Sequence, residues 1–243
     1  MLGLYTMNQN NLQLWLLYHP YGQKVLRQLQ QHIGLLVGNQ TYQHVLQLGL
    51  PEVDFLPQHT QNHKHCIAAE NAPIVAQWER LPIATESMDL VIVPLVLSQS
   101  EQPHAILREV QRVLCGYGQL VVVDINPHSL WRCQQRQFQQ ITACSHRHAV
   151  TPKRLADWLQ LLDLQPDLSR FVNYLPLCQQ AQQTDKWQWL EAAGNRWWPH
   201  AAAMYAVLAI KQTVSLRPIN NANKRPERDN EVALNPISIR KPD

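Results

Sequence analysis

The stretch MDLVIVPLVLSQSEQPHAILREVQRVLCGYGQLVVVDI, residues 88–125, determines the fold class of this chain. It begins with Met88–Val93 and ends with Leu120–Ile125, two apolar runs rich in branched side chains that are typical of parallel strands buried on both faces. Between them, apolar residues recur at helical spacing, and we predict an amphipathic helix that Gly116-Tyr117-Gly118 ends. A strand, a helix and a second strand in this order predict an α/β domain with a mostly parallel sheet.

The same alternation continues on both sides of this unit. Residues 11–33 predict two short helices, because His19-Pro20-Tyr21-Gly22 interrupts their apolar spacing. Thr151-Pro152 predicts the start of a later helix, with Thr as the N-cap. Further strands are predicted at 42–50, 63–69, 74–78, 168–174 and 202–210.

Three segments follow from this pattern. Residues 1–40 are interpreted as an N-terminal helical segment and residues 41–211 as the α/β domain. Residues 212–243 are interpreted as a disordered tail, because Asn, Arg, Lys and Pro dominate there and apolar residues are sparse.

Composition excludes several classes of protein. The net charge of +3 is too small to indicate a nucleic-acid partner by itself, and the 5 Cys contain no C-x-x-C pair. No apolar run approaches the roughly 20 residues of a membrane span, and no signal peptide is recognised, so we expect a cytoplasmic protein. The local group His59, His63, His65 and Cys66 lacks an obvious second set of ligands, and no metal site is predicted.

Glycine is scarce, with 8 in 243 residues, which is less than half of the usual roughly 7%. Few positions can therefore take a positive φ or let the backbone approach a ligand closely. In a parallel α/β sheet, ligands bind outside the carboxyl ends of the strands. That rule directs attention to the ends of the predicted strands: Gly49, Glu70, Gln77-Trp78, Pro94-Leu95 and Asn126.

Two linked segments carry a resemblance to a known family. They are LPIATESMDLVIVPLVL, residues 81–97, and ILREVQRVLCGYGQLVVVDINPHSLW, residues 106–131. They resemble class I S-adenosylmethionine-dependent methyltransferases of the methyltransferase type 11 branch. The matching residues are Ser87, Asp89, Leu90, Val91, Arg108, Glu109, Arg112, Val113, Leu114 and Gly118. The ending INPHSLW and the flanking stretches 15–22 and 196–211 look like a smaller bacterial subgroup with no assigned substrate.

The resemblance implies a Rossmann-like sheet of seven mostly parallel strands between helices, with S-adenosyl-L-methionine as cofactor. It implies a cofactor site of Gln47, Gly49 and Leu50 after the first strand, Glu70 after the second, Gln77 and Trp78 after the third, and Pro94 and Leu95 after the fourth. The glycine-rich turn of the family is degenerate, since only Gly49 remains and Gln47 replaces the acid. The helix between the second and third strands is expected to be reduced, because only eleven residues separate Glu70 from Pro82.

Two functions stay open from the sequence. The first is S-adenosylmethionine-dependent methyl transfer to an unidentified acceptor, with no catalytic residue assigned. The alternative is a catalytically inactive, methyltransferase-like binding or partner subunit, which the degenerate turn favours. We expect no membrane association and no nucleic-acid ligand, and a protein partner is compatible with either function. Asn126-Pro127 is interpreted as a structural turn.

Overall fold

The structure is a computed structural model that describes residues 6–55, 61–68, 72–129, 131, 149–176 and 188–212. All of these residues belong to one compact unit, within Met1–Thr213. The predicted tail from residue 213 onward, Glu70 and His59 lie outside the described residues. The predicted boundary between a helical segment and an α/β domain therefore remains a prediction.

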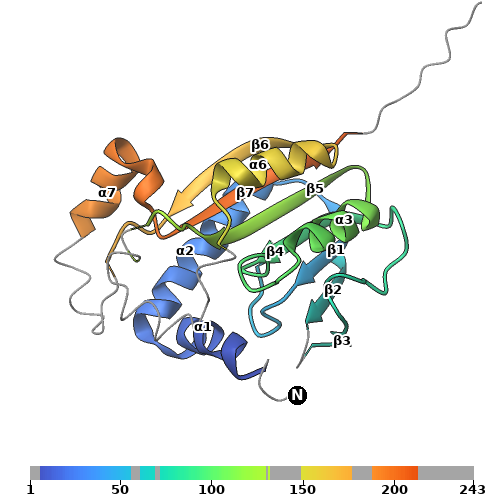
Figure 1. Ribbon diagram of the computed structural model, residues 1–243, viewed down its shortest axis with the longest axis horizontal. Helices are drawn as coiled ribbons and strands as arrows, with labels where there is room; N and C mark the ends of the chain where they lie inside the picture. Colours follow the sequence, from blue (N-terminus) through green and yellow to red (C-terminus); the bar gives the residue numbers. More distant parts are fainter. Residues whose placement is uncertain are drawn as a thin grey trace, which may run out of the picture. The chain divides into compact units, whose positions relative to one another are not determined.

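A single sheet of seven strands forms the centre, in the order β3-β2-β1-β4-β5-β7-β6 (Figure 1). The strands are β1 (Tyr42–Leu48), β2 (Gln61–Ala68), β3 (Ile74–Val75), β4 (Met88–Pro94), β5 (Leu114–Ile125), β6 (Leu164–Val172) and β7 (Met204–Lys211). β7 runs antiparallel to both of its neighbours, β5 and β6, and the other pairs are parallel. The predicted fold class is confirmed.

Helices cover the two faces of the sheet, α2 behind it and α3 and α6 in front of it in Figure 1. The helices are α1 (Thr6–Tyr18), α2 (Pro20–Val37), α3 (Pro103–Val113), α6 (Pro152–Leu161) and α7 (Gln188–Trp197), with a short 3-10 turn at Pro199–Ala201. Val25, Leu29 and Ile33 of α2 enter one core, and Ile106, Val110 and Val113 of α3 enter the other. The 3.6-residue spacing of these side chains explains why one stripe of each helix is buried.

The first three strands are joined without crossover helices in the described residues. Five residues separate the end of β2 at Ala68 from the start of β3 at Ile74, which is too short for a helical crossover. The predicted reduction of this connection is confirmed. Residues 49–55 and 76–87, on either side, also contain no helix.

Helix boundaries follow local chemistry. The break between α1 and α2 falls at His19, whose Nδ1 accepts a hydrogen bond from the Tyr21 amide at 3.2 Å. Thr151 caps α6 as predicted, because its hydroxyl accepts from the Arg154 amide at 3.2 Å.

The prediction that Gly116-Tyr117-Gly118 ends the helix is wrong. α3 already ends at Val113, and these residues lie inside β5. The register between β4 and β5 shifts from Met88↔Leu114 to Leu90↔Gln119, so the strand carries extra residues here. Tyr117 has φ +65°, and the glycines serve an irregular bulge rather than a helix stop.

Candidate functional site

The turn that follows β1 is held in a left-handed conformation. Gly49 has φ +83° and Leu50 has φ +46°. The Gly49 amide donates to the Ile67 carbonyl at 2.7 Å, which fixes the turn to β2. A Cβ on Gly49 would lie 3.0 Å from Cγ2 of Val96 and 3.7 Å from the Pro94 carbonyl oxygen. Glycine is therefore favoured here for its positive φ, and a Cβ would also crowd the side chain of Val96 in the loop after β4.

Gln47 lies beneath this turn and is 1% exposed. Its Nε2 donates to the carbonyl oxygens of Gly49 at 3.0 Å, Leu50 at 2.8 Å and Val53 at 2.9 Å. The opposite orientation of the amide would place Oε1 against three carbonyl oxygens, so the contacts fix the orientation. Oε1 is left buried without a hydrogen-bond partner. The glutamine that replaces the family acid thus organises the turn by donating, which a carboxylate cannot do.

A second left-handed turn follows β4 on the neighbouring strand. Pro94 is the last residue of β4, and Leu95 has φ +59° and is fully buried. The Leu95 amide donates to the Val123 carbonyl of β5 at 2.7 Å. Because β1 and β4 pair directly, the structure brings together Gln47, Gly49 and Leu50 with Pro94 and Leu95, as the sequence predicted.

The two residues predicted to bind the cofactor after β3 have different surroundings. Gln77 is exposed, whereas Trp78 is 7% exposed and packs in the core with Ile67, Leu81 and Ile106. The indole Nε1–H of Trp78 is buried without a hydrogen-bond acceptor. Packing accounts for the position of Trp78, and its contact with a cofactor stays a prediction.

Asp124 near the end of β5 is a buried acid that the sequence analysis missed. Its side chain is fully buried, and its two oxygens accept from the amides of Ser98 at 2.9 Å and Ile125 at 2.7 Å. Burial raises the pKa of Asp124 to about 6, against the lowering effect of the hydrogen bonds from Ser98 and Ile125. The signal was present in the sequence, since Asp124 is the one charged residue of an apolar strand. The carboxylate holds the loop after β4 in place.

The turn after β5 is structural, as interpreted from the sequence. Nδ2 of Asn126 donates to the carbonyls of His200 at 2.7 Å and Ala202 at 2.9 Å, and its Oδ1 accepts from the His128 amide at 3.0 Å. Nδ2 thereby joins the end of β5 to the segment before β7, and Oδ1 closes the turn itself.

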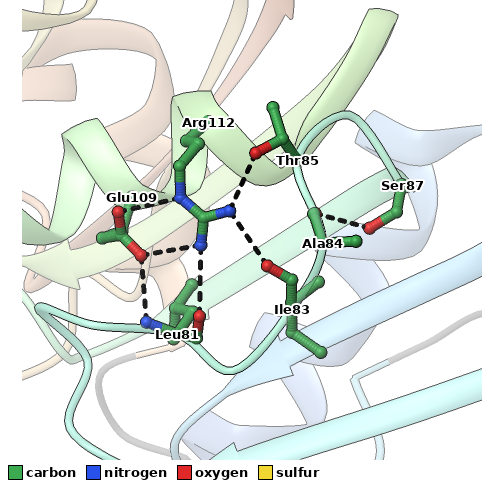
Figure 2. Close-up of polar contacts among 7 residues, drawn as sticks. All are labelled: Leu81, Ile83, Ala84, Thr85, Ser87, Glu109 and Arg112. Carbon is green, nitrogen blue, oxygen red and sulfur yellow. Dashed lines mark hydrogen bonds and ion pairs between the residues drawn. The ribbon is translucent and has the colours of Figure 1, made fainter.

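The most recognisable sequence motif lies at the other edge of the sheet (Figure 2). Nε and Nη2 of Arg112 bind the Glu109 carboxylate at 3.0 and 2.8 Å. The same guanidinium donates to the carbonyls of Leu81 at 3.1 Å and Ile83 at 2.9 Å, and Glu109 accepts from the Leu81 amide at 3.0 Å. The hydrogen bond and charge of Arg112 lower the pKa of Glu109 despite its partial burial. The motif residues Glu109 and Arg112 clamp the loop that enters β4, which is a scaffold role.

Three histidines stack on β1 and β2. The ring of His44 lies 5.2 Å from that of His63 and 6.5 Å from that of His65, nearly parallel to both. Within the part of the chain that the structure describes, no group of three or more His, Cys, Asp or Glu is placed to hold a metal ion. In the same part, no helix is long and apolar enough to cross a membrane.

Unpaired polar atoms gather where the strands end. Among the described residues, most of the buried side-chain atoms without a partner lie at or just beyond the carboxyl ends of strands, on Gln47, Trp78, Ser98, Gln99, Ser129 and Asn173, and the others lie on α2, on Gln28 and His32. Buried polar groups are normally hydrogen-bonded, so such a concentration calls for an explanation. Together with the left-handed turn at Gly49, the acceptor on Gln47 fits a polar cofactor at this edge.

Comparisons with known proteins agree with the architecture. Residues 50–122 match the family model described as "Methyltransferase domain". An Escherichia coli K12 protein, described as uncharacterized YafS, is 25% identical over 173 residues, which cover 68% of this chain and 67% of that protein.

Solved structures share the fold. One is described as the complex between the Haloferax volcanii Trm112 methyltransferase activator and a proposed methyltransferase, with a TM-score of 0.59, 14% identity and coverage of 85% of this chain and 98% of that chain. Another is an S-adenosylmethionine-dependent methyltransferase from Archaeoglobus fulgidus, with a TM-score of 0.55, 14% identity and coverage of 78% and 94%. A third such enzyme, from Thermotoga maritima, has a TM-score of 0.54, 14% identity and coverage of 82% and 93%. The strand order and these structures show that the chain has the class I methyltransferase fold, and residues 50–122 match the methyltransferase-domain model.

Proposed function

We propose that this chain binds S-adenosylmethionine at the carboxyl edge of β1 and β4 and transfers its methyl group to an acceptor that remains to be identified. The observation that carries the proposal is the contact of the two left-handed turns. Gly49 and Leu50 after β1 meet Pro94 and Leu95 after β4, above the buried, unpartnered Oε1 of Gln47. Strained backbone of this kind is concentrated at functional sites.

The proposed roles follow from the chemistry of each group. The turn at Gly49 and Leu50 lets backbone approach the cofactor without a side chain in the way, and Oε1 of Gln47 accepts a hydrogen bond from a donor group. Pro94 and Leu95 form the opposite wall. Gln77 and Trp78, and Glu70 after β2, stay predicted contacts for adenine and ribose.

Positioning is the main contribution expected of these residues. S-adenosylmethionine supplies an electrophilic methyl group on a sulfonium, which an acceptor displaces in line so that the C–S electron pair stays on sulfur. Buried hydrogen bonds hold the two turns in place: Nε2 of Gln47 donates to the first turn, and the Ser98 amide after the second turn donates to Asp124.

A second candidate function is a methyltransferase-like binding or partner subunit without catalysis. The specific observation in its favour is that Gln47 closes the first turn on itself through three carbonyls, with Leu50 only 1% exposed. The Haloferax volcanii structure, described as a complex with a methyltransferase activator, shows that this fold is compatible with a protein partner.

Thermal unfolding with and without S-adenosylhomocysteine separates the two functions. If the chain binds the methyl donor at Gly49, the ligand should raise the Tm of the wild-type chain and should not raise the Tm of Gly49→Asp. Gly38→Asp is the matched control, because Gly38 also has a positive φ, +66°, but has open space around its missing Cβ at the end of α2. No shift of the wild type at millimolar ligand, confirmed by calorimetry, would contradict the methyl-donor site and leave the partner function as the remaining candidate.

A further inference from the structure

A cavity of about 300 Å³ lies between α2 and the edge strand β6. His32 of α2 lines one side, and Arg170, Phe171, Asn173 and Tyr174 line the other. In chain order these groups are far apart, and no motif in the sequence connects them. The packing of α2 against β6 brings them together.

Asn173 presents an unused donor in this cavity wall. It follows the end of β6, has φ +65° and is 2% exposed. Its Oδ1 accepts from the Leu175 amide at 2.9 Å and from the Tyr21 hydroxyl at 3.1 Å, which fixes the orientation of the side-chain amide. Nδ2 therefore remains a buried donor without a partner. Leaving such a group unpaired is costly, and a bound acceptor would recover that cost.

His32 and Arg170 add further donors and a positive charge. Nδ1 of His32 is buried and unpartnered. Burial, followed by the charge of Arg170, lowers the pKa of His32, so the imidazole is neutral at pH 7 and offers one N–H. Arg170 is exposed at the cavity, and no Asp or Glu occurs among the lining residues that the structure describes.

We propose that the cavity of His32, Arg170 and Asn173 is a binding site for a small organic anion, held through its carboxylate or phosphate group. The Arg170 guanidinium supplies charge and paired donors, Nδ2 of Asn173 supplies a buried donor, and Leu168 in the cavity wall supplies an apolar surface for a short body.

This site is separate from the proposed methyl-donor site. β6 is four strand positions away from β1 in the sheet, in the order β1-β4-β5-β7-β6. At about 4.8 Å per step, the ends of these strands lie roughly 19 Å apart. The anion site therefore does not depend on the proposed function, and either can fail alone.

The test is a titration of the full-length chain, followed by NMR of labelled histidine rings, with benzoate and phenyl phosphate as probes. We expect a saturable shift of the His32 signals and a raised pKa of His32, because a bound anion offsets the charge of Arg170. Saturation by phenyl phosphate alone identifies a phosphate site, and saturation by benzoate alone a carboxylate site. No saturable shift with either probe overturns the proposal.

Two variants locate the binding. Arg170→Gln should weaken it about tenfold or more, and Asn173→Asp should abolish it, since Asp keeps the acceptor but replaces the donor with a negative charge. Arg170 is exposed, so its variant should fold normally. The control is Arg108→Gln, which makes the same change of charge on the exposed face of α3. Unchanged affinity in Arg170→Gln, or an equal loss in the control, contradicts the assignment. The response to S-adenosylhomocysteine should be unaffected in Arg170→Gln.

Discussion

The two edges of the sheet differ in how completely their polar groups are paired. At the amino edge, Arg112 and Glu109 satisfy each other and four groups of the loop 81–85. Lys211 is buried there too, and its ammonium donates to the carbonyls of Gln111 and Leu114. At the carboxyl edge, Gln47 and Asn173 each leave a buried polar atom unpaired. Left-handed backbone does not distinguish the edges, since it occurs at Leu50 and Leu95 on this side and at Glu86 and Tyr117 on the other.

This difference separates scaffold from site. A fully paired edge is explained by stability alone, whereas unpaired buried groups persist where a ligand uses them. Several residues that carry the resemblance to the methyltransferases lie at the paired edge, at Asp89, Glu109 and Arg112. The match to the family therefore speaks for the fold more strongly than for the activity.

Restoring the family acid at Gln47 is expected to have the largest effect. In Gln47→Glu a carboxylate would face three carbonyl oxygens in a position that is 1% exposed. We expect a loss of about 3 kcal/mol in the free energy of unfolding, measured by urea denaturation at pH 7. Gln165→Glu, on an exposed position of β6, is the control and should change stability little. Equal stability of Gln47→Glu and wild type would show that the donor contacts are not needed.

The buried acid at the carboxyl edge makes stability depend on pH. The pKa of Asp124 is raised from 3.8 to about 6. Between these values the folded state binds more protons than the unfolded state, so the free energy of unfolding falls as pH rises from about 4 to about 6. The shift of roughly two units corresponds to about 3 kcal/mol. Urea denaturation across this range should show a flatter pH profile in Asp124→Asn, and an unchanged one in the exposed control Asp157→Asn. If the pH profile of Asp124→Asn matches that of the wild type, the titration of Asp124 is not the cause of the pH dependence.

Breaking the clamp at the amino edge should be somewhat less costly. Arg112→Ala leaves the Leu81 and Ile83 carbonyls and Glu109 without their donor. Because the two charged side chains are 32% and 21% exposed, water replaces part of the loss, and we expect about 2 kcal/mol by urea denaturation. Arg108→Ala, on the exposed face of the same helix, should stay within about 0.5 kcal/mol of wild type. Similar losses in both variants would mean that the hydrogen bonds of Arg112 to the loop do not contribute to stability.

The smallest expected effect concerns the turn after β1. Gly49→Ala places a Cβ at φ +83° and 3.0 Å from Val96 Cγ2, which we expect to cost about 1 kcal/mol. Val96→Ala in the same background removes the contacting atom and should recover part of the loss, measured as Tm in a double-mutant cycle. Purely additive effects would show that φ alone limits this position.

Much of the fold could be predicted from local patterns. The runs at Met88–Val93 and Leu120–Ile125, the break at His19 and the cap at Thr151 all correspond to observed elements. The bulge at Gly116–Gly118 was misjudged because a Gly-rich stretch after a helix is compatible with either a helix stop or a strand irregularity. Which of the two forms depends on the register with β4.

The candidate site was predictable in position and less so in chemistry. The rule that ligands bind at the carboxyl ends of strands led to Gly49, Pro94 and Leu95, which do lie together. The burial of Trp78 and Asp124 and the exposure of Gln77 depend on neighbours from other elements, which no local pattern encodes.

The sequence by itself determined the α/β class, the approximate strand positions and the resemblance to the methyltransferases, because strand and helix periodicity and motif spacing are properties of neighbouring residues. Only the tertiary structure decided what the polar residues do. It turned Gln47 into a donor for three carbonyls, Arg112 into the clamp of a loop, and His32 with Asn173 into one cavity wall. The physical reason is that the free energy of a hydrogen bond or a buried charge depends on its partners, and here those partners come from other parts of the chain.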